Sequence, residues 1–139
     1  KVLTYKGKKD HADFKYPYNA AYQSVKILTA HTLSPSGKVI SVGSREVHDI
    51  TSPEDASAAI YSHQRVKVVN FPSVTPGSTV EITLEHHSDR GFWATECFQI
   101  HDPIKLKTVS VSLPAGMTLS KKLPSLLLKH SEKIVKNRC

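Results

Sequence analysis

The residues best suited to chemistry lie between positions 86 and 101. Three histidines stand near the thiol of Cys97 in the sequence: His86, His87 and His101. A thiol paired with an imidazole could act as a nucleophile, provided that a helix N-terminus or a nearby cation lowers its pKa. Cys97 instead lies in a strand-like run directly after Glu96, and a neighbouring acid opposes thiolate formation. The pattern therefore favours a packing or surface thiol over a nucleophile.

A metal site is the second possibility raised by the same histidines. Adjacent residues on a strand point to opposite faces, so His86 and His87 cannot chelate one ion if a strand runs through them. The 8 histidines of the chain form no HxH or HxxxH pattern. Cys97 and Cys139 supply neither a disulfide framework nor a ligand set. We expect no metal and no other cofactor.

The loop expected around residues 86–93 could instead bind a glycan or a peptide. Trp93 could serve as an aromatic platform there, although a large aromatic residue in a β-core usually packs. This possible binding surface comprises His86, His87, Arg90 and Trp93. The sequence contains no GxSxG, P-loop or dinucleotide-binding pattern and no evident carboxylate pair. We therefore expect no catalytic residues, and a non-enzymatic role for this chain.

The positive charge of the chain is concentrated at its two ends. Residues 1–15 and 121–139 hold eleven of the 19 Lys and Arg but only three of the 12 acids, so the ends carry +8 and residues 16–120 carry −1. A domain that reads a polyanion concentrates charge on a folded face. Nucleic acid is therefore an unlikely partner. No apolar run approaches the roughly 18 residues of a membrane span.

The clearest secondary structure is a pair of strands in the middle of the chain. Residues 65–71 are rich in Val, and residues 79–84 alternate apolar with polar side chains, which is the period of a half-buried strand. Pro72 ends the first strand because it cannot donate a ladder hydrogen bond. Residues 75–78, which read Thr-Pro-Gly-Ser, have turn chemistry around Gly77. The sequence predicts a hairpin with a long loop.

The remaining segments predict more short elements separated by Gly and Pro turns. Strands are expected at residues 2–5, 22–33, 38–42, 45–50, 92–100 and 106–113, turns at 34–37, 86–91 and 114–116, and a short helical turn at 52–59. The strands at 22–33 and 38–42 should form a second hairpin. Residues 123–135 fit a closing hairpin or a helix. This spacing predicts one mostly β domain over residues 1–139, an antiparallel β-sandwich of immunoglobulin-like architecture.

An ordered set of landmarks also resembles a known family. The stretches are PYNAAYQSVKI (17–27), SGKVISV (36–42), RVKVVNFPSVTPGSTVEI (65–82), GFWATECFQ (91–99) and DPI (102–104). Together they resemble, over residues 16–115, a bacterial domain of unknown function that precedes transglutaminase-like, papain-type cysteine hydrolase domains in secreted or periplasmic proteins. The chain begins with Lys1 in place of Met, as expected of an excised domain, a processed chain or a trimmed one.

The resemblance implies an accessory β-sandwich module whose partner is the adjacent domain or another protein. Phe71, Pro72 and Gly77 would shape the turn, and Trp93 would anchor the core. The catalytic Cys, His and Asp of such proteins lie in the following domain, so no catalytic residue is carried over to this chain.

Overall fold

The computed structural model describes residues 1–52, 63–90, 102–114, 116–120 and 122. The chain groups into two compact units, Lys1–Ala94 and Thr95–Cys139. In the second unit, residues 102–114, 116–120 and 122 contain neither a helix nor a strand. All of the regular elements described below belong to the first unit. A single domain over residues 1–139 stays a prediction.

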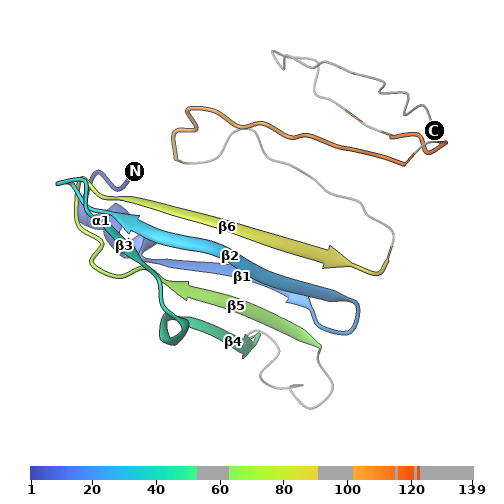
Figure 1. Cartoon of the computed structure of the whole chain (residues 1–139), viewed down its shortest axis with the longest axis horizontal. Helices are drawn as coiled ribbons and strands as arrows, with labels where there is room; N and C mark the ends of the chain where they lie inside the picture. Colours follow the sequence, from blue (N-terminus) through green and yellow to red (C-terminus); the bar gives the residue numbers. More distant parts are fainter. Residues whose placement is uncertain (53–62, 91–101, 115, 121, 123–139) are drawn as a thin grey trace. The chain divides into compact units, whose positions relative to one another are not determined.

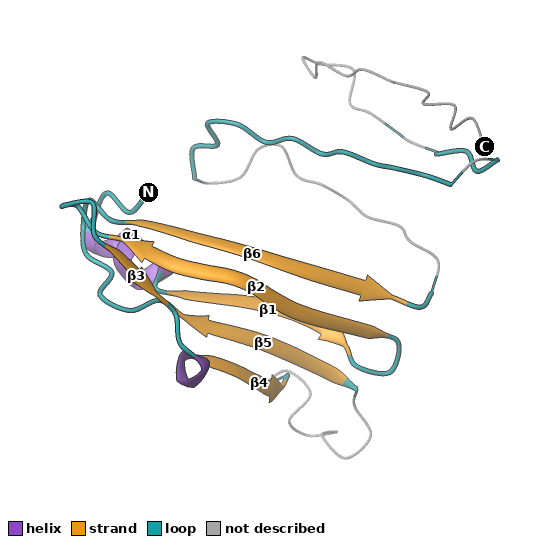
Figure 2. Ribbon diagram, in the orientation of Figure 1, coloured by secondary structure: helices purple, strands orange, loops and turns teal. Residues whose placement is uncertain are grey.

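The first unit is mostly β and contains two antiparallel sheets of three strands each (Figure 1). Its elements are α1 (Tyr5–His11), β1 (Asp13–Asn19), β2 (Gln23–Leu33), β3 (Val39–Ser41), the 3-10 helix η1 (Ser44–Glu46), β4 (Val47–Thr51), β5 (Gln64–Asn70) and β6 (Thr79–Ser88). Sheet A has the order β1-β5-β4 and sheet B the order β3-β2-β6 (Figure 2). The inner faces of both sheets contribute to one core, as expected of a sandwich.

The central hairpin predicted from the sequence is wrong, because its two strands belong to different sheets. β5 pairs with β1 and β4, whereas β6 pairs with β2. The predicted turn does form: Ser78 N–H donates to the Thr75 carbonyl at 3.0 Å, and Gly77 has a φ of 94°. The connection between the strands also buries Phe71 and Val74. A connection that buries two side chains suits a crossing between sheets better than a hairpin loop.

The apolar residues of β2 do not alternate strictly with polar ones, and a β-bulge explains the irregularity. Ile27 pairs with Leu84 and Thr29 pairs with Thr83, so Leu28 has no counterpart on β6. The extra residue shifts the alternation by one, which lets both Ile27 and Ala30 pack against the core. Leu28 itself is 49% exposed. Strict alternation would place Ile27 and Ala30 on opposite faces of β2. Because of the bulge, both face the core.

The strand expected at residues 2–5 does not form: residues 2–4 are irregular, and α1 begins at Tyr5. The Thr4 hydroxyl accepts a hydrogen bond from Gly7 N–H at 3.0 Å, which caps the helix. Val2, just before the helix, is 2% exposed and exchanges two backbone hydrogen bonds of 2.7 Å with the turn at Gly77 and Ser78. Backbone hydrogen bonds to the turn at residues 77–78 therefore hold the segment before α1 in place.

The predicted hairpin of β2 and β3 is confirmed by the pairing of His31 with Ser41 and of Leu33 with Val39. Its turn is closed by Gly37 N–H, which donates to the Ser34 carbonyl at 3.0 Å. The turn at residues 114–116 is also confirmed, because Met117 N–H donates to the Pro114 carbonyl at 3.2 Å.

Three other predictions were wrong or partly wrong. The strand predicted at residues 45–50 is a 3-10 helix followed by β4. The polar turn predicted at 86–91 is strand through Ser88, because β2 continues to pair with it there. No strand forms at residues 106–113, where Val109 and Val111 are about half exposed. The helical turn at 52–59, the strand at 92–100 and the hairpin or helix at 123–135 lie wholly or almost wholly outside the described residues.

The core lies at the end of the sandwich that contains α1. Val2, Val69, Phe71 and Val74 are its buried residues. Partly buried residues from both sheets pack around them: Ala12, Phe14, Ile27, Ala30, Val42, Val47, Val80 and Ile82. The opposite end of sheet A is built differently, and it contains the candidate site.

Candidate functional site

The inner face of sheet A changes from apolar to charged along the strands. Val69, which is fully buried, pairs with Phe14 on one side and Val47 on the other. Two residues back along β5, Lys67 pairs with Asp49, and two further back Arg65 pairs with Tyr18. Alternate residues of a strand share a face, so these polar residues point inward like Val69.

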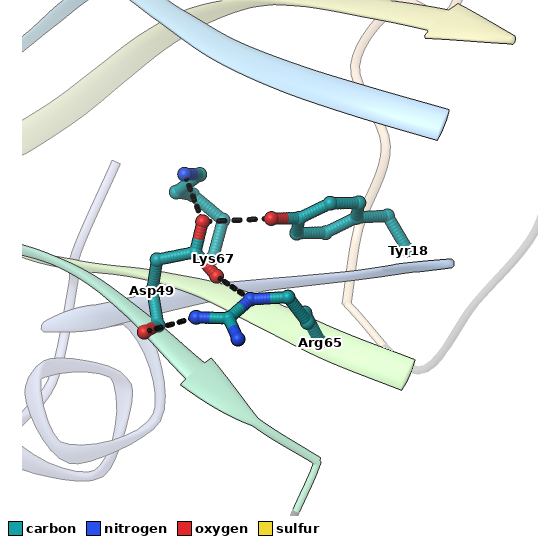
Figure 3. A network of polar contacts seen from close by, with 4 residues as sticks. All are labelled: Tyr18, Asp49, Arg65 and Lys67. Atoms are coloured by element: carbon teal, nitrogen blue, oxygen red, sulfur yellow. Dashed lines mark hydrogen bonds and ion pairs between the residues drawn. The ribbon is translucent and has the colours of Figure 1, made fainter. Parts of the chain in front are cut away.

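Tyr18, Asp49, Arg65 and Lys67 form one polar network, which we call the Asp49 cluster (Figure 3). The Asp49 carboxylate accepts hydrogen bonds from the Tyr18 hydroxyl at 2.7 Å, from Arg65 Nε at 2.7 Å and from Lys67 Nζ at 2.5 Å. A terminal nitrogen of Arg65 also donates to the Asp49 backbone carbonyl at 2.9 Å. The three strands of sheet A are thus cross-linked by side chains as well as by their ladders.

The cluster shifts the pKa values of its members in opposite directions. Partial burial alone would raise the pKa of Asp49, but the hydrogen bonds from Lys67, Tyr18 and Arg65 outweigh it and lower the pKa to about 2. Burial, together with the neighbouring Asp49 carboxylate, raises the pKa of Tyr18. Asp49 is therefore ionised at neutral pH and is a weak proton acceptor, which suits a structural or binding role better than base catalysis.

An open cleft lies between the two sheets next to the Asp49 cluster. Its volume is about 400 Å³. Its apolar walls come from β2, β4 and the segment after β3, and include Val25, Ile27, Ala30, Val42 and Val47. Lys67 and Lys26 also line it. With two cations and one carboxylate, the cluster has a surplus positive charge beside an apolar cleft.

His86 and His87 lie in β6 and point to opposite faces of sheet B. His86 pairs with the buried Val25, and its ring contacts Tyr16 of sheet A, with Nδ1 3.2 Å from the hydroxyl. His87 pairs instead with Asp89 at 2.9 Å, where both side chains are exposed. The two imidazoles therefore do not face one another. Among the described residues, no group of three or more metal-ligating side chains gathers.

Arg90 lies beyond the end of β6, where its guanidinium stacks 4.3 Å from the ring centroid of Tyr22. Trp93, Cys97, His101 and Cys139 lie outside the described residues. The surface expected from His86 to Trp93 therefore stays a prediction, and so does the anchoring role of Trp93.

The residues expected to shape the turn lie near the core. Phe71 is buried, and its N–H donates to the Ala12 carbonyl at 2.8 Å. Pro72 follows it, and a Cβ added to Gly77 would lie 3.1 Å from Cγ of Pro35. These three residues thus lie where α1, β5 and the β2–β3 turn come together.

Sequence reasoning did not single out the Asp49 cluster. A signal was present in β5, where Arg65, Lys67 and Val69 alternate with Val66 and Val68. Both rows of this strand could face a core, and the Val row is the more obvious choice. Only the pairing with β1 and β4 shows that the row with the charges faces inward.

Comparison with protein families identifies the chain. The model of a family described as a domain of unknown function with a solved structure (DUF3857) matches residues 1–137. The chain belongs to the DUF3857 family. The match extends on both sides of residues 16–115, on which the resemblance was based.

One solved structure resembles the fold of this DUF3857 chain. It is the crystal structure of a protein described as "a putative protease" from Parabacteroides distasonis, with a TM-score of 0.59 and 17% sequence identity. The likeness covers 66% of this chain but only 18% of that protein. At this identity it establishes the fold alone. No curated protein matches the chain.

The residues that the structure describes include no helix that is both long and apolar enough to cross a membrane.

Proposed function

We propose that this chain is a non-catalytic accessory domain of a larger protein, in which it docks a neighbouring domain or positions that domain's substrate. The observation that carries the proposal is how much of each chain the structural likeness covers. Two thirds of this chain match less than one fifth of the similar Parabacteroides distasonis protein. The same fold thus occurs there as a small part of a much longer chain, as an accessory module would.

The larger protein, in this proposal, carries a transglutaminase-like, papain-type cysteine hydrolase domain after this chain and functions in the periplasm or outside the cell. This part rests on the resemblance of residues 16–115. The chemistry of the Asp49 cluster agrees with a role in docking. Asp49 is held by three donors, and the apolar cleft beside it offers a surface for contact.

The decisive experiment uses the full-length protein in which this chain occurs. Its reading frame after residue 139 should encode a Cys, a His and an Asp in that order. Full-length protein lacking residues 1–139 should keep a downstream thiol that reacts with a cysteine reagent, but should lose at least tenfold in kcat/KM on a protein substrate. Unchanged kcat/KM on deletion would contradict the proposal.

A thiol titration tests the non-catalytic part of the proposal. The reactivity of Cys97 and Cys139 would be measured across pH in folded and unfolded chain. A catalytic thiol would react fast below neutral pH only when folded, whereas a structural thiol is protected or titrates near its free value of about 8.5. Fast reaction of Cys97 at low pH in the folded chain would make this domain the enzyme.

A further inference from the structure

Among the described residues, β3 is the strand along the edge of sheet B beside the cleft, and it covers only part of that edge. β3 pairs with residues 31–33 of β2, and Val42 N–H donates to the Ala30 carbonyl at 3.0 Å. Within the described residues, no strand pairs with residues 23–29 on that side. Figure 1 shows β3 beside one end of β2 only. The open stretch is about as long as an average strand of 5–6 residues.

The cleft lies along this open edge and has walls of two kinds. Val25, Ile27 and Ala30 of sheet B, with Val47 of sheet A, provide apolar contacts. Lys67 lines it from sheet A, and its side chain is only 16% exposed. An extended segment laid beside β2 would therefore meet apolar side chains and an inward-pointing cation.

The charge of these walls indicates the chemistry of the occupant. Lys67 pairs with the carboxylate of Asp49, which it shares with Arg65. Lys26 also lines the cleft, but it is exposed and lies opposite Glu85 of β6, so the surplus charge is that of Arg65 and Lys67 against Asp49. An ammonium group can donate three hydrogen bonds, and a second carboxylate near Lys67 would balance the surplus charge in a partly dehydrated place.

We propose that the cleft receives an extended segment of a partner protein, which adds to sheet B beside residues 23–29 of β2 and places an acidic side chain at Lys67. Main-chain pairing along an open edge would supply affinity, and the side-chain pocket would supply specificity. This inference rests on the proposed docking function and specifies the partner chemistry of the site.

The test screens a displayed library of random eight-residue peptides against the full chain. Binders should share β-branched residues at alternate positions and one Asp or Glu. Replacing that acid by its amide should weaken binding at least tenfold, as should Lys67→Met, and the two changes together should cost no more than either alone. Peptide binding should also slow hydrogen exchange of backbone amides within residues 23–29.

The matched control is Lys15→Met, because Lys15 is exposed on the opposite face of sheet A. If Lys67→Met does not fold, Lys26→Glu provides the second test. It reverses a cation that lines the cleft without touching the Asp49 cluster, and it should weaken the same peptides while Lys15→Glu does not.

Two outcomes would overturn the inference: a library without binders, or binders that are indifferent to both Lys67→Met and Lys26→Glu. Neither outcome bears on the accessory role, which the deletion of residues 1–139 tests separately. Loss of kcat/KM on deletion, but not in Lys67→Met, would leave the docking function standing and place its surface elsewhere.

Discussion

Asp49 and Lys67 face each other across the β4–β5 ladder, with Oδ2 and Nζ 2.5 Å apart on the face of sheet A that also buries Val69. A sandwich interior normally carries apolar side chains at such positions. The ion pair is tolerated at this position because Arg65 and Tyr18 donate further hydrogen bonds to the same carboxylate. One end of the interior is thus ionic and the other apolar.

Removing the Asp49 carboxylate should destabilise the protein in a pH-dependent manner. The folded pKa of about 2 lies below the ordinary value of 3.8, so Asp49 stabilises the fold above pH 4, and this contribution disappears as the pH falls from 4 to 2. Asp49→Asn should lower the free energy of unfolding at pH 7 by about 1–2 kcal/mol, since the group is partly exposed.

Chemical denaturation at pH 7, 4 and 2.5 measures this difference between wild type and Asp49→Asn, which should shrink with decreasing pH. Asp89→Asn is the control, because Asp89 is exposed and pairs with the exposed His87, so the change should alter stability by less than about 0.5 kcal/mol. An equal effect of Asp49→Asn at all three pH values would mean that the carboxylate titrates alike in the folded and unfolded states.

Thr32→Val should stabilise the protein. Thr32 is fully buried on β2, and its hydroxyl has no hydrogen-bond partner among the described residues. Replacing an unsatisfied buried hydroxyl by a methyl group of similar shape should raise the free energy of unfolding by about 1 kcal/mol. Thermal melts would compare it with Thr83→Val, an exposed position on β6. A lower melting temperature for Thr32→Val would show that the hydroxyl is bound.

Val2→Ala should reveal how strongly the residues before α1 hold the core. Val2 is 2% exposed, and truncating a buried side chain of this size costs about 2 kcal/mol, including the cavity left behind. Leu3, its neighbour, is 73% exposed, so Leu3→Ala should change stability by less than about 0.5 kcal/mol. Equal denaturation midpoints for the two variants would contradict the buried position of Val2.

Gly77→Ala and Gly37→Ala separate backbone strain from close packing. Both glycines have positive φ, 94° and 86°, so alanine is strained at either position. An added Cβ at Gly77 would also lie 3.1 Å from Pro35, whereas at Gly37 it would meet nothing within 4 Å. Both variants should lose about 1 kcal/mol, and Gly77→Ala more than Gly37→Ala. Chemical denaturation measures both losses, and a larger loss in Gly37→Ala than in Gly77→Ala would exclude tight packing at Gly77.

Local patterns in the sequence predicted most strands and the pairing of β2 with β3, but not the partners of β5 and β6. The structure contains the strand predicted at residues 79–84 and the turn predicted around Gly77. Both features are compatible with a hairpin and with a crossing between sheets. Which of the two forms depends on the strands that pair with β5 and β6. These partners, β1 and β2, lie far from β5 and β6 in the sequence. The β2 bulge and the helix after Thr4 likewise depend on long-range pairing.

The Asp49 cluster could not be predicted because its members come from three separate strands. Nothing in the spacing of Tyr18, Asp49 and Lys67 indicates proximity. The histidines attracted attention as a local group, yet β6 places His86 and His87 on opposite faces. Adjacency in sequence was therefore a poor guide to adjacency in space.

The crossing between β5 and β6 also bears on how the chain folds. Both sheets depend on pairs between distant residues, such as Asp13 with Asn70 and Gln23 with Ser88. Among the strand pairs of the described residues, only the short pairing of β2 with β3 is local in sequence. Chains dominated by non-local contacts close large loops before gaining stabilising contacts, and they refold in milliseconds to seconds. During synthesis, neither sheet can be completed until its last strand, β5 or β6, has left the ribosome.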